Sequence, residues 1–461
     1  MTYANLRQSV SAWAWHLTET GVAPGARVAI CLPDPVGYAV ALLGVLAAGR
    51  VAVPLDPAAP APELARVLDI AKAEAMICES AAGLPPVPTV LQPPAEGRET
   101  RPAPPSAGGG IFLCTSGTTG TPKGIELGEE QLAHVASAVA RQHQLTPDDR
   151  GYCTLPLFHV NAEVVGLLAT LSAGACLVLD RAFSRRRFWP VIEEREITWI
   201  NAVPAIIAVL AMAQDQPAPH PRVRFVRSAS APLPSAVLVR FEQLTGLPVI
   251  ETYGMTEAAS MITANPLDGQ RKPGSVGLPA GTELRVVRYD GEEPVLCSEY
   301  VVGQVQIRGP GVITSYASGG RPGVIDQDGW LDTGDLGHLD EDGYLYLAGR
   351  SDDVINRGGE KIYPREIEDV LLTQPGVLTA VVVGAEDEVL GQRPVAYIVP
   401  KDAELTDTAL ADALLAACEA ALPKPKRPSA VVVVEELPLG PTGKVARRRL
   451  RELATASQPR A

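Results

Sequence analysis

The sequence predicts an α/β protein with a large N-terminal domain, in which helices flank β-sheets, and a small C-terminal α+β domain. Three observations lead to this prediction. Short apolar runs alternate with helical segments over most of the chain, the pattern changes after Gly349, and 461 residues suffice for two or three domains with separate cores. We place the domains at residues 1–350 and 351–461.

The N-terminal alternation begins with a βαβ pattern. An apolar run at 28–32 is followed by a proline-marked turn, a helical segment at 37–49 and a second apolar run at 51–55. The same alternation recurs in GACLVLD, RRRFWPVIEER, ITWINAVP, VRFVRSAS, VLVRFEQLTG and LPVIETYG, between residues 174 and 254. Residues 84–109 are too rich in Pro and Gly for regular structure, so we expect a surface loop between strands there, with a domain linker as the alternative.

The last hundred residues have a different, more compact pattern. A helix is expected from Pro364, with Ile367, Val370 and Leu371 on its buried face, because Pro favours the first helical turn. The remaining elements are expected in TAVVVGAE, RPVAYIVP, DTALADALLAACEAAL and AVVVVEEL, which read as strand, strand, helix and strand. This pattern predicts the small α+β domain.

Composition excludes several classes of protein. The formal net charge of −13 disfavours nucleic acid and anionic membranes as partners. No run of about 18 apolar residues predicts a membrane span, and the start lacks an apolar signal core. The seven cysteines never form a C-x-x-C pair, which argues against zinc and against a disulfide framework. We therefore expect a cytoplasmic protein, either a monomer or a homodimer.

CTSGTTGTPKG, at 114–124, combines glycines, hydroxyl side chains and a lysine, a composition suited to holding phosphate. Its flanks are strand-like, so the loop is expected to join two strands. It differs from the ATPase P-loop because Thr121 and Pro122 separate Gly120 from Lys123, and no Ser or Thr follows the lysine. By itself this segment is also compatible with a solvent-exposed turn.

Five further motifs decide whether this segment is a phosphate-binding loop or a solvent-exposed turn. They are LPLFH (155–159), ETYGMTEA (251–258), DGWLDTGDLG (328–337), GRSDDVINRGGEKIYPREIE (349–368) and LPLGPTGKVARRRL (437–450). Together with the loop at 114–124, in this order, they resemble the adenylate-forming family of acyl-CoA synthetases, coumarate-CoA ligases, luciferase and peptide-synthetase adenylation domains. The resemblance spans nearly the whole chain and is closest to the acyl-CoA ligases.

The resemblance implies a two-step reaction with ATP, Mg²⁺ and coenzyme A. A carboxylic acid attacks the α-phosphorus of ATP, pyrophosphate leaves, and a thiol then attacks the acyl-adenylate. Because both nucleophile and electrophile are anionic, the chain must supply cations, hydrogen-bond donors and alignment. The residues that the resemblance assigns to ATP are Thr115, Ser116, Gly117, Thr118, Thr119, Gly120, Lys123, Glu251, Thr252, Tyr253, Thr256, Asp335, Arg350 and Lys444.

The resemblance assigns individual roles to several of these residues. Tyr253 stacks on adenine, and Thr256 bonds the α-phosphate. Glu257 is the expected Mg²⁺ ligand, which is reasonable because Mg²⁺ is commonly held by one or two carboxylates together with phosphate oxygens. Asp335 and Arg350 bind the ribose.

The small domain is expected to be mobile, with its hinge at Asp352. Its rotation presents Lys444 for adenylation, and then Arg357, Gly358 and Gly359 for the coenzyme A step. Lys444, Thr256 and His159 are the catalytic candidates. Lys444 is the residue we expect to matter most for the first half-reaction.

The acyl pocket is expected to comprise His159, Asn161, Ser228, Ala229, Ser230, Thr252, Gly254 and Met261. Amino-acid-activating members place an aspartate near the position of His159, and here none is present. Glu163, one helical turn further on, is the alternative partner for an amino group, so an amino acid is disfavoured but stays open. We expect a non-amino carboxylic acid.

The expected acceptor is coenzyme A, with an acyl carrier protein as the alternative. Two other classes are disfavoured. A P-loop-like ATPase is opposed by the strand-to-strand loop without G-K-S/T. A non-catalytic nucleotide-binding protein is opposed by the presence of Lys444, Glu257, Asp335 and Arg350.

Overall fold

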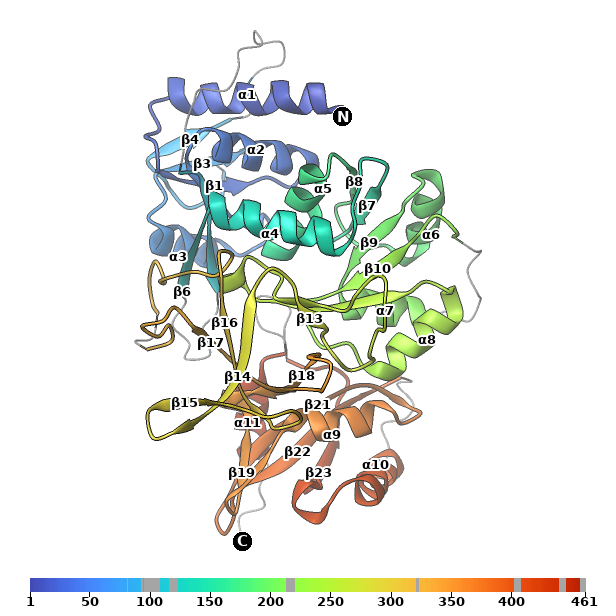
Figure 1. Ribbon diagram of the computed structural model, residues 1–461. Helices are drawn as coiled ribbons and strands as arrows, with labels where there is room; N and C mark the ends of the chain where they lie inside the picture. Colours follow the sequence, from blue (N-terminus) through green and yellow to red (C-terminus); the bar gives the residue numbers. More distant parts are fainter. Residues whose placement is uncertain are drawn as a thin grey trace. The chain divides into compact units, whose positions relative to one another are not determined.

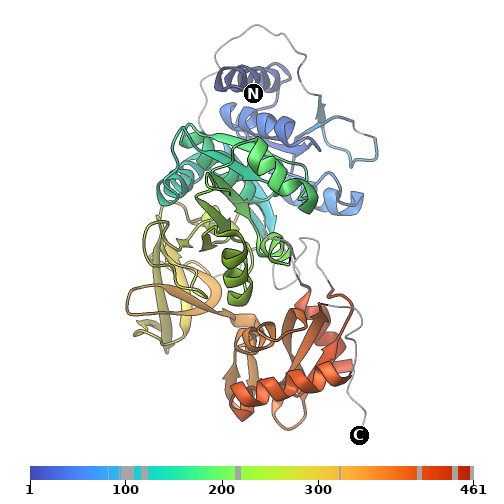
Figure 2. The same cartoon turned by 90° about the vertical axis from the view of Figure 1, so that its right-hand side faces the viewer.

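The computed structural model describes residues 1–80, 82–92, 94, 108–115, 123–212, 220–320, 323–401, 408–438 and 445–456. The chain forms two compact units (Figures 1 and 2). The first comprises residues 1–233, 237–284 and 307–331, and the second comprises residues 234–236, 285–306 and 332–461. The predicted α/β class is confirmed, because helices flank the sheets in both units. The predicted domain boundary after residue 350 stays a prediction.

The first unit contains two sheets, in agreement with the predicted domain of β-sheets flanked by helices. The first has six strands in the order β4-β3-β1-β2-β5-β6, all parallel except for the β5–β6 pair. Its strands are β1 (Arg27–Cys31), β2 (Val51–Pro54), β3 (Ala75–Cys78), β4 (Thr89–Leu91), β5 (Gly110–Thr115) and β6 (Lys123–Gly128). β4 lies inside the segment predicted to be a loop, so that prediction was wrong at 89–91.

Three helices accompany this sheet: α1 (Tyr3–Glu19), α2 (Pro35–Ala47) and α3 (Ala61–Ala71). α1 lies alongside α2 in Figure 1. α2 begins two residues before the predicted segment, because the Asp34 side chain accepts a hydrogen bond from the Gly37 amide at 2.7 Å and Pro35 occupies the first turn. α3 covers one face of the sheet and buries Leu64 and Leu68 against β1, β2 and β3.

The second sheet of this unit has seven strands in the order β13-β12-β11-β10-β9-β7-β8. They are β7 (Arg150–Cys153), β8 (Cys176–Leu179), β9 (Trp199–Ala202), β10 (Phe225–Ser228), β11 (Val249–Tyr253), β12 (Thr263–Ala264) and β13 (Leu278–Pro279). The run from β8 to β11 is parallel, and β12 and β13 are antiparallel. This arrangement places the ends of β10 and β11 next to each other.

The connecting helices are α4 (Glu129–Gln142), α5 (Ala169–Ser172), α6 (Arg185–Glu194), α7 (Pro204–Ala211) and α8 (Ser235–Thr245). Two short helices lie near the predicted motifs: η1 (Asn161–Leu168), a π-helix, and η2 (Thr256–Ala258), a 3₁₀-helix. π-Helices are rare in proteins, and those that occur are often found at functional sites. The π-helix η1 therefore marks the segment after LPLFH as a candidate site.

A five-stranded sheet, ordered β15-β14-β16-β17-β18, carries the DGWLDTGDLG motif. Its strands are β14 (Glu283–Asp290), β15 (Glu293–Leu296), β16 (Gly303–Arg308), β17 (Leu331–Leu339) and β18 (Leu345–Arg350). The last two pair antiparallel, which sets Asp335 opposite Arg350.

The C-terminal sheet has the order β20-β19-β22-β21, with β23 beside β22, and Figure 2 shows helices on both of its sides. α9 and α10 bury Ile367, Leu371 and Leu414 on one face, while α11 buries Leu450 on the other. The elements are η3 (Ser351–Asp353), β19 (Ile355–Arg357), β20 (Glu360–Ile362), α9 (Pro364–Leu372), β21 (Val377–Asp387), β22 (Gly391–Pro400), α10 (Thr408–Ala421), η5 (Lys424–Lys426), β23 (Ala430–Val433) and α11 (Arg447–Ala456). The predicted elements of the small domain are confirmed.

Candidate active site

The loop at 114–124 joins the antiparallel strands β5 and β6, as predicted. Thr115 and Lys123 face each other as the last pair of that ladder. The predicted phosphate-binding residues Ser116, Gly117, Thr118, Thr119 and Gly120 lie outside the described residues. The described part of the chain therefore gives the two ends of the loop and places its lysine at the start of β6.

Lys123 is held near an aromatic ring that the sequence analysis did not single out. Its ammonium lies 4.8 Å from the centre of the Tyr316 ring, within the range of a cation–π interaction. The segment around Tyr316 is tied to β6, because the Gly124 amide donates to the Ser318 carbonyl at 3.0 Å. A Cβ at Gly124 would lie 2.5 Å from Phe112 and from Ser318, so this approach requires glycine.

The ETYGMTEA motif forms the end of β11 and a tight reversal. Gly254 permits it, because a Cβ there would lie 1.2 Å from the Ser260 carbonyl oxygen. The Ile262 amide returns to donate to the Tyr253 carbonyl at 2.8 Å, and Ser260 adopts a φ of +99°. Such a φ is costly for a residue with a Cβ, and backbone strain of this kind clusters at functional sites.

Glu257 lies in η2, inside this reversal, and is 7% exposed. The Tyr316 hydroxyl donates to its Oε1 at 2.9 Å. Within the described ranges no lysine or arginine forms an ion pair with Glu257. A buried carboxylate that is oriented by a neutral donor and not neutralised by a basic side chain suits a cation ligand.

The described residues contain no group of three or more His, Cys, Asp or Glu side chains able to hold a metal ion. A single carboxylate nevertheless fits Mg²⁺, because this ion keeps waters and takes most of its other ligands from substrate phosphates. Glu257 is thus chemically suited to the predicted role.

The predicted ribose pair, Asp335 and Arg350, is in direct contact. Arg350 Nη1 donates to Asp335 Oδ1 at 3.0 Å and to the Thr333 carbonyl at 2.9 Å. Gly334, at φ +72°, lies against the guanidinium, where a Cβ would come within 2.8 Å of Nη2. The backbone of β17 and the Arg350 guanidinium together fix the Asp335 carboxylate. A carboxylate that binds two neighbouring hydroxyls needs such a fixed orientation.

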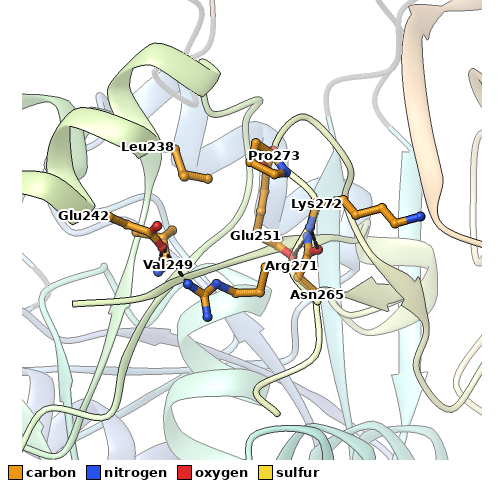
Figure 3. Close-up of a pocket in the computed structure, with 8 residues that line it drawn as sticks. All are labelled: Leu238, Glu242, Val249, Glu251, Asn265, Arg271, Lys272 and Pro273. Carbon is orange, nitrogen blue, oxygen red and sulfur yellow. Dashed lines mark hydrogen bonds and ion pairs between the residues drawn. The ribbon is translucent and has the colours of Figure 1, made fainter. Parts of the chain in front are cut away.

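The other predicted ATP residues that the structure describes, which are Glu251, Thr252, Tyr253 and Thr256, lie on or beside β11. Thr252 is buried, and its hydroxyl donates to the Ser228 carbonyl at 3.1 Å. Tyr253 is 9% exposed at the end of the strand. Glu251 is also buried and lines the pocket of Figure 3, with Leu238 and Glu242 of α8 and with Arg271 and Lys272. Of the predicted site residues that the structure describes, only Glu251 lines this pocket.

The predicted acyl-pocket residues come from the start of η1, the end of β10, and β11 with the reversal that follows it. Asn161 is 6% exposed, and its side-chain amide donates to the Ser230 hydroxyl at 3.1 Å. Ser228, Ala229 and Met261 are buried, and Ser230 is exposed. His159 is exposed immediately before η1, with its ring 4.7 Å from that of Phe158 and its carbonyl accepting from the Ala162 amide.

Glu163, the alternative partner for a substrate amino group, is not exposed to solvent. Its side chain is fully buried, and Tyr38 of α2 donates to its Oε1 at 2.9 Å. Burial raises the pKa of Glu163 to about 8, although the Tyr38 hydrogen bond partly opposes this shift. At neutral pH the carboxyl group is mostly protonated, so it is poorly suited to pair with a substrate ammonium.

In the second unit, Gly358 and Gly359 form the turn between β19 and β20, with φ angles of +61° and +90°. Arg357 donates to the Pro425 carbonyl at 2.7 Å. At the predicted hinge, the Asp352 carbonyl accepts from Arg451 of α11 at 3.1 Å. Lys444, the predicted catalytic lysine, lies outside the described residues.

Two residues that the sequence analysis did not select belong to these groups. Tyr316 orients Glu257, yet no motif distinguishes it from any other surface tyrosine. Arg227 donates from Nη1 to Asn161 Oδ1 at 2.7 Å and to Asn201 Oδ1 at 3.0 Å. A signal existed for Arg227, because an arginine inside the apolar strand FVRS is unusual, and it was overlooked.

Known proteins resemble this chain over nearly its whole length. A model of the AMP-binding enzyme family matches residues 1–317, and a model of the AMP-binding enzyme C-terminal domain matches residues 366–444. A sulfoacetate–CoA ligase from Cupriavidus necator is 39% identical, with 98% of this chain and 92% of that protein covered. An oxalate–CoA ligase from Arabidopsis thaliana is 35% identical, with coverages of 97% and 92%.

Solved structures show the same similarity. The crystal structure of ATP-bound MatB from Rhodopseudomonas palustris superposes with a TM-score of 0.87 at 28% identity, covering 98% of this chain and 93% of that one. In the described part of the present chain, no helix is both long and apolar enough to cross a membrane.

Proposed function

Because the chain belongs to the AMP-binding enzyme family, we propose that it joins a carboxylic acid to coenzyme A while ATP is converted to AMP and pyrophosphate. The relatives named above support this reaction type, since both are CoA ligases. Mg²⁺ and ATP are the cofactor and co-substrate of the reaction. A structure of an o-succinylbenzoate synthetase from Bacillus subtilis, 30% identical, holds both.

One observation carries the proposal. Lys123, Tyr316 and Glu257 form a connected series, in which the ammonium lies over the ring and the ring hydroxyl donates to the carboxylate. The series links the end of the phosphate loop to the carboxylate of ETYGMTEA. It provides a cation for phosphate oxygens and an anion for the metal at one place, which is what binding of a magnesium triphosphate requires.

The bound Mg²⁺ would neutralise phosphate charge. Glu257 is the residue that would hold it, and Tyr316 fixes the orientation of that carboxylate. Lys123 and the loop before it hold the outer phosphates, while Thr256 donates to the α-phosphate. Asp335, oriented by Arg350, accepts hydrogen bonds from the ribose hydroxyls. Together these residues align ATP for in-line attack.

In the first step a carboxylate oxygen of the acid forms a bond to the α-phosphorus, and the bond to pyrophosphate breaks. Lys444 is proposed to stabilise the negative charge that gathers there. In the second step the coenzyme A sulfur attacks the acyl carbon, AMP leaves with the bonding electrons, and the thiol proton is released. The turn at Arg357, Gly358 and Gly359 is proposed to border the pantetheine arm after rotation about Asp352.

The acid is proposed to lack an amino group. Peptide-synthetase domains need a carboxylate to pair with the substrate ammonium, and the nearest alternative, Glu163, is engaged with Tyr38 and has a pKa of about 8. Exchange of pyrophosphate into ATP should therefore respond to simple carboxylic acids and not to α-amino acids.

The acceptor is proposed to be coenzyme A, and the protein to be cytoplasmic. All seven cysteines are free, as is usual in a reducing compartment. The decisive experiment supplies ATP, Mg²⁺ and a panel of acids together with either coenzyme A or a phosphopantetheinylated carrier protein. Thioester on coenzyme A supports the proposal, whereas thioester on the carrier alone identifies a carrier-loading enzyme.

A further inference from the structure

We propose that the acid carries a second anionic group, and that Arg227, acting through Asn161, makes Ser230 a hydrogen-bond donor for it. The inference rests on the proposed function, because it assumes that the acid binds beside Asn161 and Ser230. The substrate class is a small carboxylic acid with a second carboxylate or a sulfonate.

The first step is the charge of Arg227. Its side chain projects from β10 and is 1% exposed, and no carboxylate lies within ion-pair distance among the described residues. Nε is buried without a hydrogen-bond partner. Burial lowers the pKa of Arg227 to about 9, which leaves it protonated at neutral pH. An unpaired buried cation is costly, so its retention calls for a compensating anion or a functional role.

The second step is the orientation of Asn161. A guanidinium only donates hydrogen bonds, so the side-chain oxygens of Asn161 and Asn201, and not their nitrogens, must face Arg227 Nη1. The Asn201 nitrogen lies 3.3 Å from the Asn161 oxygen and reinforces this orientation. The amide nitrogen of Asn161 is thereby turned toward Ser230.

The third step concerns Ser230. Its oxygen accepts from Asn161, so its own proton is directed elsewhere, and it donates to no group in the described part of the chain. Ser230 is exposed and adopts a φ of +74°, an uncommon conformation for serine. The chain of donors from Arg227 through Asn161 thus ends in a hydroxyl that offers its proton to a ligand.

Such a site favours an anionic acceptor. A carboxylate or sulfonate accepts from the hydroxyl and brings negative charge toward the buried cation. An amide can accept the same hydrogen bond through its carbonyl oxygen but brings no charge, and an ammonium group places a donor against a donor. Hydrogen bonds to charged groups contribute about 1.5–3 kcal/mol and neutral ones about 0.5–1.5 kcal/mol, and the difference of about 1–1.5 kcal/mol corresponds to roughly 5- to 10-fold in selectivity.

The test compares two acids of nearly equal shape, malonate and its half-amide malonamate, by AMP release in the presence of coenzyme A. Sulfoacetate serves as the sulfonate arm. The wild type is expected to prefer malonate over malonamate by roughly 5- to 10-fold in kcat/KM. Ser230→Ala should remove most of that preference by raising the KM for malonate, with little change in kcat.

Arg227→Met should lower the preference in the same way, and Arg227→Lys should restore part of it. Arg222→Met, at an exposed arginine paired with Glu196, is the control and should leave the preference unchanged. If Arg227→Met does not fold, the exposed Ser230→Ala variant alone decides. If Arg227→Met lowered kcat/KM by the same factor for malonate and for malonamate, Arg227 would have only a structural role and the proposal would be overturned.

A wild type without preference for the dianion would also overturn it. Failure of the proposed function has a different signature, because no acid would then yield AMP with the wild type.

Discussion

The hydroxyl of Tyr316 lies 2.9 Å from Oε1 of Glu257 and holds that carboxylate within the reversal after β11. The same tyrosine presents its ring to the Lys123 ammonium. A residue outside every recognised motif therefore connects the phosphate loop with the proposed magnesium ligand.

The first prediction separates these two contacts. Tyr316→Phe keeps the ring and removes the hydrogen bond, so the Mg²⁺ concentration for half-maximal activity should rise about 3- to 10-fold, as loss of one such bond implies. Tyr316→Leu should in addition raise the KM for ATP. Titration of Mg²⁺ at saturating acid measures both. If Tyr316→Phe leaves the Mg²⁺ dependence unchanged, Glu257 is not held for the metal.

The second prediction concerns the ribose pair. Arg350→Leu removes the donor that orients Asp335, so kcat/KM for ATP should fall roughly 10-fold or more. The preference for ATP over 2′-deoxy-ATP should shrink at the same time, because the carboxylate is no longer fixed. Arg308→Leu, which breaks an exposed pair with Glu283, is the control. An unchanged preference between the two nucleotides would contradict the assignment.

The third prediction is a pH dependence of stability. The pKa of Glu163 is raised from 4.5 to about 8 by burial, so the folded protein keeps this proton after the unfolded chain has lost it. Stability should therefore fall as the pH rises from about 5 to 8 by an amount on the order of a few kcal/mol.

Glu163→Gln should flatten that slope, since it keeps the shape of the neutral carboxyl group and cannot ionise. Urea unfolding of both proteins at several pH values measures the difference. Parallel slopes for wild type and variant would show that Glu163 is ionised in the folded protein.

The fourth prediction separates the two half-reactions. Lys444→Ala should abolish formation of the acyl-adenylate yet leave thioester formation from supplied acyl-adenylate largely intact, because the lysine is needed only while charge gathers at the α-phosphorus. Pyrophosphate exchange measures the first step, and thioester formation from synthetic adenylate measures the second. Equal losses in both would argue against alternation of the small domain about Asp352.

The sequence predicted the parts of the molecule that depend on local pattern. Alternating apolar segments located most strands and helices, and Pro364 located the start of α9. The β5–β6 connection was predicted because strand-like residues flank the phosphate loop. The short strand β4 was missed, because its three residues lie in a Pro-rich stretch that masks their pairing with β3.

The site residues that were missed depend on tertiary contacts. Tyr316 meets Glu257 across 59 positions of sequence, and no periodicity encodes such a contact. Arg227 meets Asn161 across 66 positions, and its importance follows from the lack of a carboxylate nearby among the described residues, which only a three-dimensional arrangement reveals. The division of N-terminal strands between two sheets likewise depends on pairing between distant segments.

Transfer of oxygen from the acid to AMP distinguishes an acyl-adenylate intermediate from every other use of ATP. With an acid labelled with ¹⁸O in its carboxylate, ATP, Mg²⁺ and coenzyme A, we expect one ¹⁸O atom in the phosphate of each AMP released, because the carboxylate oxygen that attacks the α-phosphorus stays with AMP when the thiol displaces it. Mass spectrometry of AMP reads this label. Formation of ADP, or of AMP without ¹⁸O during thioester synthesis, would rule out the acyl-adenylate as the intermediate.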